Sequence, residues 1–173
     1  AFSGNTNAAF TKITSLTSKH LYAIALNSTS LYIAGEDGLC LYSANLTNPT
    51  FVYGNSVGFS NLRALAITPS GAALAFGDQS HLEWNMQGTK AKNTQVYLPS
   101  AKDVHFYNPQ YGMMAANKYT LRYTNDGGSS WNVVLPNAGF LNGAIPQIEK
   151  VFVKGANEAF AVGSLSGRDY LVK

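Results

Sequence analysis

The chain has 173 residues, enough for one domain with a sizeable hydrophobic core. Hydrophobic residues make up 46% of it and charged residues only 12%, a composition that leaves Ser, Thr, Asn and Gly to supply the polar surface. The net charge of +3 comes from scattered Lys and Arg without a basic run, which argues against nucleic-acid binding, and no apolar stretch is long enough to predict insertion into a membrane.

The predicted strands come in four similar groups. In the first group, apolar runs at 21–26, 31–34 and 39–42 are separated by short polar turns, and a fourth strand is expected at 50–53. The same order begins again at Leu62, Val104 and Val151, with further fourth strands expected at 94–98 and 131–135. One position shared by the four copies holds Gly35, Gly77, Asn117 and Gly163.

Four antiparallel strands repeating about every 40 residues are typical of the blades of a β-propeller. The sequence therefore predicts an all-β fold: a single propeller domain, or propeller fragment, over 1–173, with a β-sandwich as the alternative. The blades are expected at about 19–53, 61–98, 103–135 and 148–173, and a strand at 10–13 would complete the last one. A closed four-blade ring, half of a dimeric ring and a fragment of a larger propeller all remain open.

The turn before the third group's last strand carries the clearest motif. Residues 124–131 read TNDGGSSW, which has the form Ser/Thr-x-Asp-x-Gly-x-Ser/Thr-Trp. We expect Asp126 to accept hydrogen bonds within this turn, Gly127 and Gly128 to adopt positive φ, and Trp131 to be buried.

This motif resembles the Asp box of BNR-type β-propellers, and residues 103–134 resemble one repeat of the photosystem II assembly-factor-like propellers and, more loosely, of sialidases. The resemblance implies a structural role for the box, whose defining residues are Thr124, Asp126, Gly128, Ser130 and Trp131. It also implies a scaffold or assembly function rather than a catalytic one.

The residues themselves give little support for catalysis. A sialidase needs an arginine cluster, whereas Arg63, Arg122 and Arg168 fall at unrelated places in their repeats. The three histidines are far apart in sequence and lack neighbours at metal-ligand spacing, so neither a metal nor a cofactor is expected. We therefore predict no enzyme activity, with a sialidase-like glycan-processing enzyme as the first alternative and a structural component of a cell-surface or phage assembly as the second.

A propeller displays its loops around one axis, and those between second and third strands and before first strands form the expected binding face. The candidate residues there are Glu36, Asp37, Asp78, His81, Lys102, Asp103, Lys118, Tyr119, Arg168 and Asp169. The expected partner is a protein or a surface glycan, with self-association through incomplete blade edges as a further possibility. Low charge with abundant Asn and Ser favours an extracellular, periplasmic or cell-surface location.

Overall fold

The computed structural model describes residues 17–54, 60–68, 71, 73–78, 100–117, 120–134 and 146–173, and the backbone of two further strands at 81–84 and 91–93. The first sheet contains β1 (Leu21–Leu26), β2 (Leu31–Gly35), β3 (Cys40–Ser43) and β4 (Val52–Tyr53). The second contains β5 (Leu62–Ile67), β6 (Ala73–Gly77), β7 (His81–Trp84) and β8 (Ala91–Asn93). The third contains β9 (Ala101–Phe106), β10 (Gly112–Ala116), β11 (Thr120–Thr124) and β12 (Asn132–Val133), and the fourth β13 (Gln147–Gly155), β14 (Glu158–Leu165) and β15 (Arg168–Val172).

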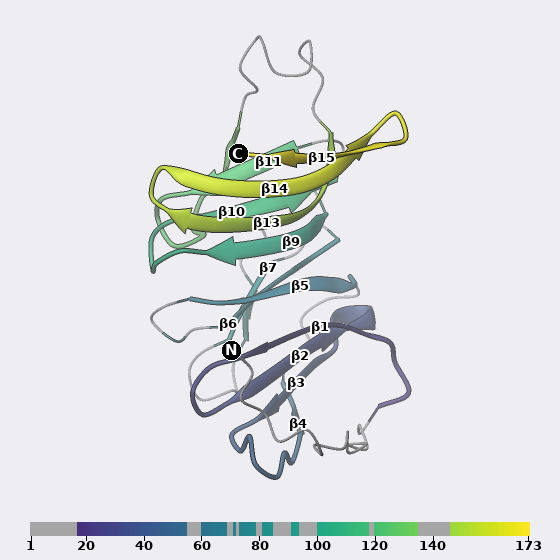
Figure 1. Cartoon of the computed structure of the whole chain (residues 1–173). Helices are drawn as coiled ribbons and strands as arrows, with labels where there is room; N and C mark the ends of the chain where they lie inside the picture. The colour runs from purple at the N-terminus through teal and green to yellow at the C-terminus, as the bar shows by residue number, and fades with distance from the viewer. Residues whose placement is uncertain are drawn as a thin grey trace, which may run out of the picture.

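Each sheet is an antiparallel meander, and the sheets follow one another through their first strands. β1 packs beside β5, β5 beside β9 and β9 beside β13. Figure 1 shows the four sheets stacked in chain order, with the first and fourth at opposite ends of the row. This is the architecture of propeller blades around an axis, so the predicted all-β propeller fold is confirmed, and the described blades form an open arc.

Two expected fourth strands lie outside the described residues. In the second blade β8 (Ala91–Asn93) pairs with β7, with Ala91 opposite Trp84, whereas the strand expected at 94–98 lies outside the described residues. The strand expected at 10–13 lies outside the described residues. The described part of the chain contains no helix long and apolar enough to cross a membrane.

Apolar clusters fill the space between successive blades. Between the second and third blades, Phe76 and Leu74 of β6 pack with Met114 and Ala116 of β10, and Trp131 joins the same cluster. Small residues on the second strands let the sheets approach closely. The alanines of these strands are at most 4% exposed where they pack between sheets: Ala34, Ala73, Ala75, Ala115, Ala116 and Ala161.

Every first strand contains a β-bulge close to the start of its ladder. In β1 the pairing jumps from Leu21 to Ala23, and in β5 from Leu62 to Ala64, which leaves one extra residue on the first strand. The same irregularity follows Ala101 in β9 and Ile148 in β13. The extra residues of the four bulges are Tyr22, Arg63, Lys102 and Glu149.

In three blades the residue that pairs with the first strand just before the bulge is a glycine with almost no room for a side chain. A Cβ atom at Gly35, Gly77 or Gly163 would lie 2.2, 1.8 or 2.4 Å from a backbone carbonyl oxygen. In the third blade the residue at this position is Ala116, opposite Ala101, and not Asn117 as the aligned repeats suggest. Asn117 instead donates its N–H to the Ser100 carbonyl, and the residues after Gly35 and Gly77 make the equivalent bond. In the sequence alone Asn117 looks like a break between two strands, as the glycines do. Aligning it with those glycines shifted the third repeat by one residue.

Candidate binding face

The four bulge residues lie on neighbouring first strands at equivalent places, so their side chains gather at one edge of the blades. β-Bulges commonly redirect a side chain in this way beside functional sites. Tyr22, Arg63, Lys102 and Glu149 are here called the bulge row. The row crosses all four blades, and its members are an aromatic ring, two cations and a carboxylate.

Arg63 joins the first two blades. Its guanidinium carbon lies 5.2 Å from the centre of the Tyr22 ring, within the range of a cation–π interaction. The same guanidinium donates two hydrogen bonds to the Asp78 carboxylate, from Nε to Oδ1 at 3.2 Å and from Nη2 to Oδ2 at 3.3 Å. This bidentate pair fixes the plane of the arginine while leaving its side chain 43% exposed.

Lys102 and Glu149 join the third and fourth blades. Lys102 Nζ donates to Glu149 Oε1, and Gln147 Nε2 donates to the same oxygen at 2.8 Å. The hydrogen bond from Lys102 lowers the pKa of Glu149 below its ordinary value, so this carboxylate stays charged. The side chain of Glu149 is still 49% exposed and remains open to another molecule.

A hollow of about 460 Å³ lies over this part of the row. Three successive blades contribute a pair of residues each, and five of the six side chains carry charge. The lining consists of Arg63, Asp78, Lys102, Asn117, Glu149 and Lys150. Cations and carboxylates alternate in it, so the surface presents donors and acceptors at short intervals without a dominant sign.

Two side chains of β9 hold the fourth blade in place beneath this hollow. Asp103 accepts the N–H of Val151 at 2.9 Å and a hydrogen bond from Lys150 at 3.2 Å. His105 Nδ1 accepts the N–H of Val153 at 3.0 Å, and burial lowers the pKa of this histidine. Asp103, predicted as a binding residue, therefore has both carboxylate oxygens engaged within the protein.

The other predicted residues fall at the same edge of the blades where they are described. Glu36 and Asp37 lie in the short 3-10 turn η1 (Glu36–Gly38), where Glu36 accepts the N–H of His20 and Asp37 pairs with Lys19 at 3.3 Å. Arg168 and Asp169 begin β15 on the far side of the fourth blade and do not line the hollow. Lys118 and Tyr119 lie outside the described residues, as does the side chain of His81.

Sequence reasoning found Asp78 and Lys102 but missed most of the hollow. Arg63, Glu149 and Lys150 lie inside first strands, where an alternating pattern assigns residues to packing rather than to a rim. A signal was present, because Tyr22 and Arg63 already share a position in the aligned repeats. Extending the third and fourth repeats back to Ala101 and Ile148 would have placed Lys102 and Glu149 at the same position as Tyr22 and Arg63.

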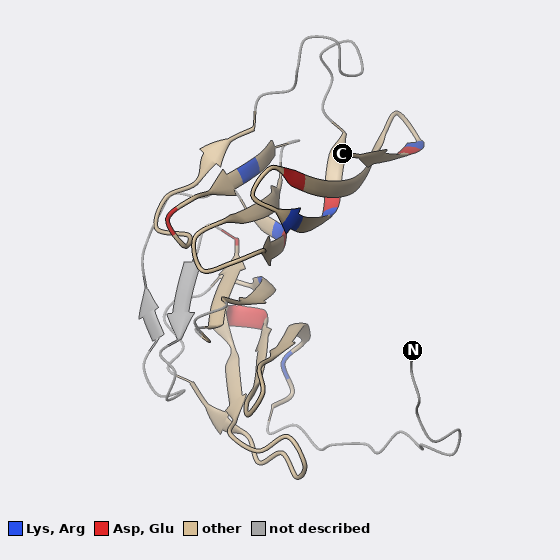
Figure 2. Ribbon diagram, turned by 60° about the vertical axis from the view of Figure 1, so that its left-hand side comes forward, with Lys and Arg blue, Asp and Glu red and all other residues tan. Residues whose placement is uncertain are grey.

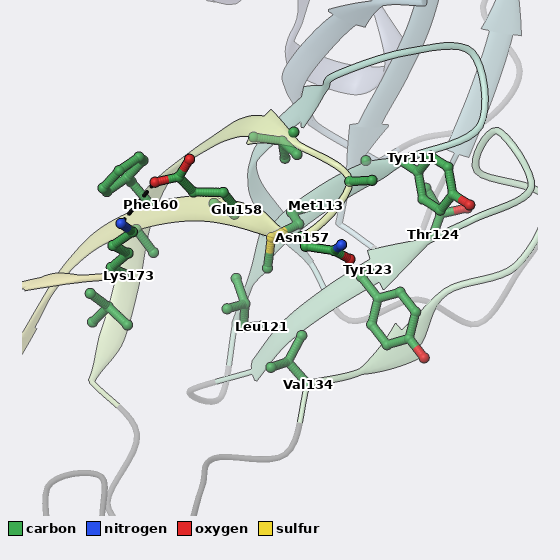
Figure 3. A pocket seen from close by; sticks show the side chains of 17 residues that line it. Tyr111, Met113, Leu121, Tyr123, Thr124, Val134, Asn157, Glu158, Phe160 and Lys173 are labelled. Atoms are coloured by element: carbon green, nitrogen blue, oxygen red, sulfur yellow. Dashed lines mark ion pairs between the residues drawn. The ribbon is translucent and has the colours of Figure 1, made fainter.

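A second, apolar groove of about 330 Å³ lies between the third and fourth blades, at the opposite ends of the same strands. Figure 3 shows Met113, Leu121 and Val134 at its centre, Tyr111 and Tyr123 on one side, and the Glu158–Lys173 ion pair on the other. The two ammonium groups of Lys173 and Lys154, 2.8 and 2.9 Å away, hold the pKa of Glu158 at about 2. Such a groove can accept an apolar side chain while its rim stays polar.

The turn at 124–131 is closed by its own side chains. Asp126 accepts the Ser130 N–H at 2.9 Å and the Thr124 hydroxyl at 2.7 Å, and Thr124 Oγ1 accepts the Gly128 N–H at 2.8 Å. The hydrogen bonds from Ser130 are the main reason why the pKa of Asp126 is lowered. Gly127 and Gly128 adopt φ of 73° and 90°, and Trp131 is only 7% exposed.

The three arginines of the chain lie at separate places. Arg63 contacts Asp78 and Tyr22, Arg122 donates to the Trp131 carbonyl at 3.2 Å, and Arg168 begins β15. Within the described ranges no group of three His, Cys, Asp or Glu side chains is arranged to hold a metal ion. Lys and Arg are interspersed with Asp and Glu along the described ribbon, as Figure 2 shows, rather than gathered in a patch of one sign.

Comparison with solved structures gives propellers. The chain is similar to YCF48 bound to D1 peptide, with a TM-score of 0.69 and 12% identity over 93% of this chain and 53% of that one. For YCF48 from Cyanidioschyzon merolae the TM-score is 0.67 at 15% identity, over 95% of this chain and 59% of that one. For the RRP9 WD40 repeats the TM-score is 0.68 at 9% identity, over 90% of this chain and 48% of that one.

Comparisons with protein-family models and with curated proteins give no match. At the identities above, structural likeness shows the fold alone, and the chain spans about half the length of the propellers it resembles. The propeller fold is thus supported both by the similar solved structures and by the strand order of this chain's own sheets.

Proposed function

We propose that this chain is a noncatalytic, protein-binding propeller module that contacts its partner through the bulge row. The observation that carries the proposal is the hollow over Arg63, Lys102 and Glu149, to which three blades each bring polar side chains. An exposed, rigidly held row of mixed charge suits a polypeptide better than a small uniform ligand, because a polypeptide offers backbone and side-chain groups of both kinds.

The internal pairing of these charges also shapes the expected partner. Arg63 and Lys102 already contact Asp78 and Glu149, so a partner gains by sharing these pairs rather than by neutralising a lone charge. The exposed ring of Tyr22 extends the surface to the first blade. We expect a segment with both acidic and basic residues, whose binding weakens as salt rises. That one similar propeller is solved with a peptide bound is consistent with this partner class.

A display experiment tests the proposal. A library of random peptides is selected against the immobilised pure chain, and the enriched peptides are then measured with the double variant Arg63→Glu, Lys102→Glu. We expect a loss of binding of at least tenfold, because two charges in the centre of the hollow are reversed. Enriched peptides that bind the double variant as tightly as the original chain would refute the bulge row as the site.

The matched control is Lys154→Glu. Lys154 is 60% exposed and ion-paired with Glu158, and it lies at the other end of β13, away from the row. Peptide binding should survive this change within about twofold. Equal losses in both variants would attribute binding to net charge alone.

Three finer assignments belong to the same proposal: the Asp box, a glycan partner and a location outside the cell. The hydrogen bonds around Asp126 support an Asp box, and with it kinship to the assembly-factor-like propellers. A surface glycan as partner and a location outside the cell remain proposals drawn from composition and resemblance. The separated arginines give a sialidase-like activity no support, and hydrolysis of a sialoside by the pure chain would overturn the noncatalytic assignment.

A further inference from the structure

The bulge row advances by one residue for each blade. The first strands β1, β5, β9 and β13 follow one another along the stack in Figure 1, and Cα atoms of neighbouring first strands approach within 8 Å. Side chains of the row reach across these steps, since Arg63 contacts the Tyr22 ring and Lys102 forms an ion pair with Glu149. A molecule that lies across the blades therefore meets one member of the row at each step.

An extended polypeptide has a repeat that fits this step. Its residues rise by about 3.3 Å each, so two residues cover about 6.6 Å, and every second side chain points to the same face. Asn117 also suits an extended segment, because its side-chain amide lines the hollow and can pair with a peptide group as both donor and acceptor. A helix would leave this amide without such a partner, since helical peptide groups are bonded within the helix.

Arg63 and Glu149, two blades apart, each keep one polar atom outside their internal hydrogen bonds. Arg63 binds Asp78 through Nε and Nη2, and Nη1 takes no part in this pair. Glu149 Oε1 accepts from Lys102 and Gln147, and Oε2 takes no part in these bonds. The row thus offers a cationic contact and an anionic contact separated by two steps.

The neighbouring lysines compete little for these contacts. Lys102 lies between them along the row, is only 22% exposed and has its ammonium group bound to Glu149. Lys150 is 70% exposed beside Glu149, but its ammonium group lies 3.2 Å from the Asp103 carboxylate. Charge recognition should therefore be sharpest at Arg63 and at Glu149.

We propose that the bulge row binds an extended partner segment lying across the blades, with an acidic residue at Arg63 and a basic residue four positions away at Glu149. The inference rests on the proposed function and adds the conformation and the charge spacing of the partner. The residue midway between the two charges faces Lys102, and the alternate residues point to solvent. Changing the spacing by one residue would turn one charge away from the row.

Mixed display libraries test the spacing. Three libraries of equal size carry a fixed Asp and a fixed Lys, in both orders, three, four or five positions apart in otherwise random nine-residue peptides. After selection on the immobilised pure chain, sequencing should show the four-position library enriched at least tenfold over the other two. Similar enrichment at three and four positions would indicate a helical partner, because both spacings share one helix face. That result, or equal enrichment of all three libraries, would overturn the proposal.

Charge reversal tests which side chain recognises which position. With a fully random library, Arg63→Glu should change the preferred acidic residue to a basic one and leave the preference four positions away unchanged. Glu149→Lys should do the converse, and Lys154→Glu, the control used above, should change neither. Circular dichroism checks that all three variants are folded.

The outcomes separate this inference from the proposed function. If Arg63→Glu, Lys102→Glu abolishes peptide binding but the two single reversals alter the same position or none, the row is a binding site and the extended register is wrong. If no peptide is enriched, or the double variant binds the enriched peptides as tightly as the original chain, the proposed function fails and this inference fails with it.

Discussion

At the scale of single residues, Trp131 is a large side chain in the packing between the second and third blades. Its ring meets Phe76 and Phe106 edge to face, with centroids 5.7 and 6.0 Å away. Its indole N–H is buried without a hydrogen-bond partner in the described structure. The residue therefore stabilises the fold through its apolar area, and a polar contact contributes nothing.

Replacing Trp131 by alanine should lower the free energy of unfolding by about 3–5 kcal/mol, because it leaves a cavity between two blades. Trp131→Phe should cost only about 1–2 kcal/mol, since it keeps a ring and removes an unsatisfied donor. Urea unfolding measures both, with Val133→Ala as the control at an exposed neighbour, expected within about 0.5 kcal/mol. A loss below about 1 kcal/mol for the alanine variant would contradict the packing described here.

His105 makes the contact between the third and fourth blades sensitive to pH. Burial lowers its pKa, and its Nδ1 accepts a backbone N–H only while it carries no proton. Because the unfolded chain binds this proton more readily, stability is present above the pKa of a free histidine, about 6.5, and is lost as pH falls through the lower pKa of the folded state. The nearby carboxylate of Asp103 opposes the shift without reversing it.

The expected outcome is a fall in unfolding free energy between about pH 7.5 and pH 5 that is larger for the original chain than for His105→Asn. Asparagine keeps an acceptor in a similar place and does not titrate. Urea titrations at a series of pH values measure the difference, in which the other two histidines cancel because both proteins contain them. Parallel pH profiles for the two proteins would show that His105 does not carry the effect.

At the scale of elements, the repeating strands could be predicted because alternating apolar runs and turn residues are local signals. The bulges could not, since a bulge arises from pairing between strands and leaves no composition of its own. The missed members of the hollow follow from this: Arg63 and Glu149 read as ordinary strand residues until the pairing is known. The turn at 124–131 was predictable because the hydrogen bonds of its Thr124 and Asp126 side chains close within the turn itself.

The glycines opposite the bulges give a prediction at this scale. Gly77→Ala should destabilise the protein by about 3 kcal/mol, because the new Cβ would lie 1.8 Å from the Asn61 carbonyl oxygen and the backbone of β5 must move. Gly155→Ala is the control, since nothing lies within 4 Å of its Cβ position. Thermal unfolding of both variants makes the comparison. Equal melting temperatures would mean that the first strands are not held as closely as the bulge geometry requires.

At the scale of the whole molecule, stability should vary along the arc because each blade contacts only its neighbours. β6 is buried along its whole length, whereas β14, in the same place in its blade, is buried at only two of eight residues. β2 is buried although it lies in an end blade, since Leu31 and Ile33 pack with Leu41 and Phe51 within the first sheet. The weak end of the arc is therefore the fourth blade.

Native-state hydrogen exchange measures this gradient. Backbone amides of β14 should exchange at least tenfold faster than those of β6, because opening the fourth blade disrupts one described interblade cluster instead of two. Amides of β2 should resemble those of β6. Uniform protection across the four sheets would show instead that the arc unfolds as one cooperative unit.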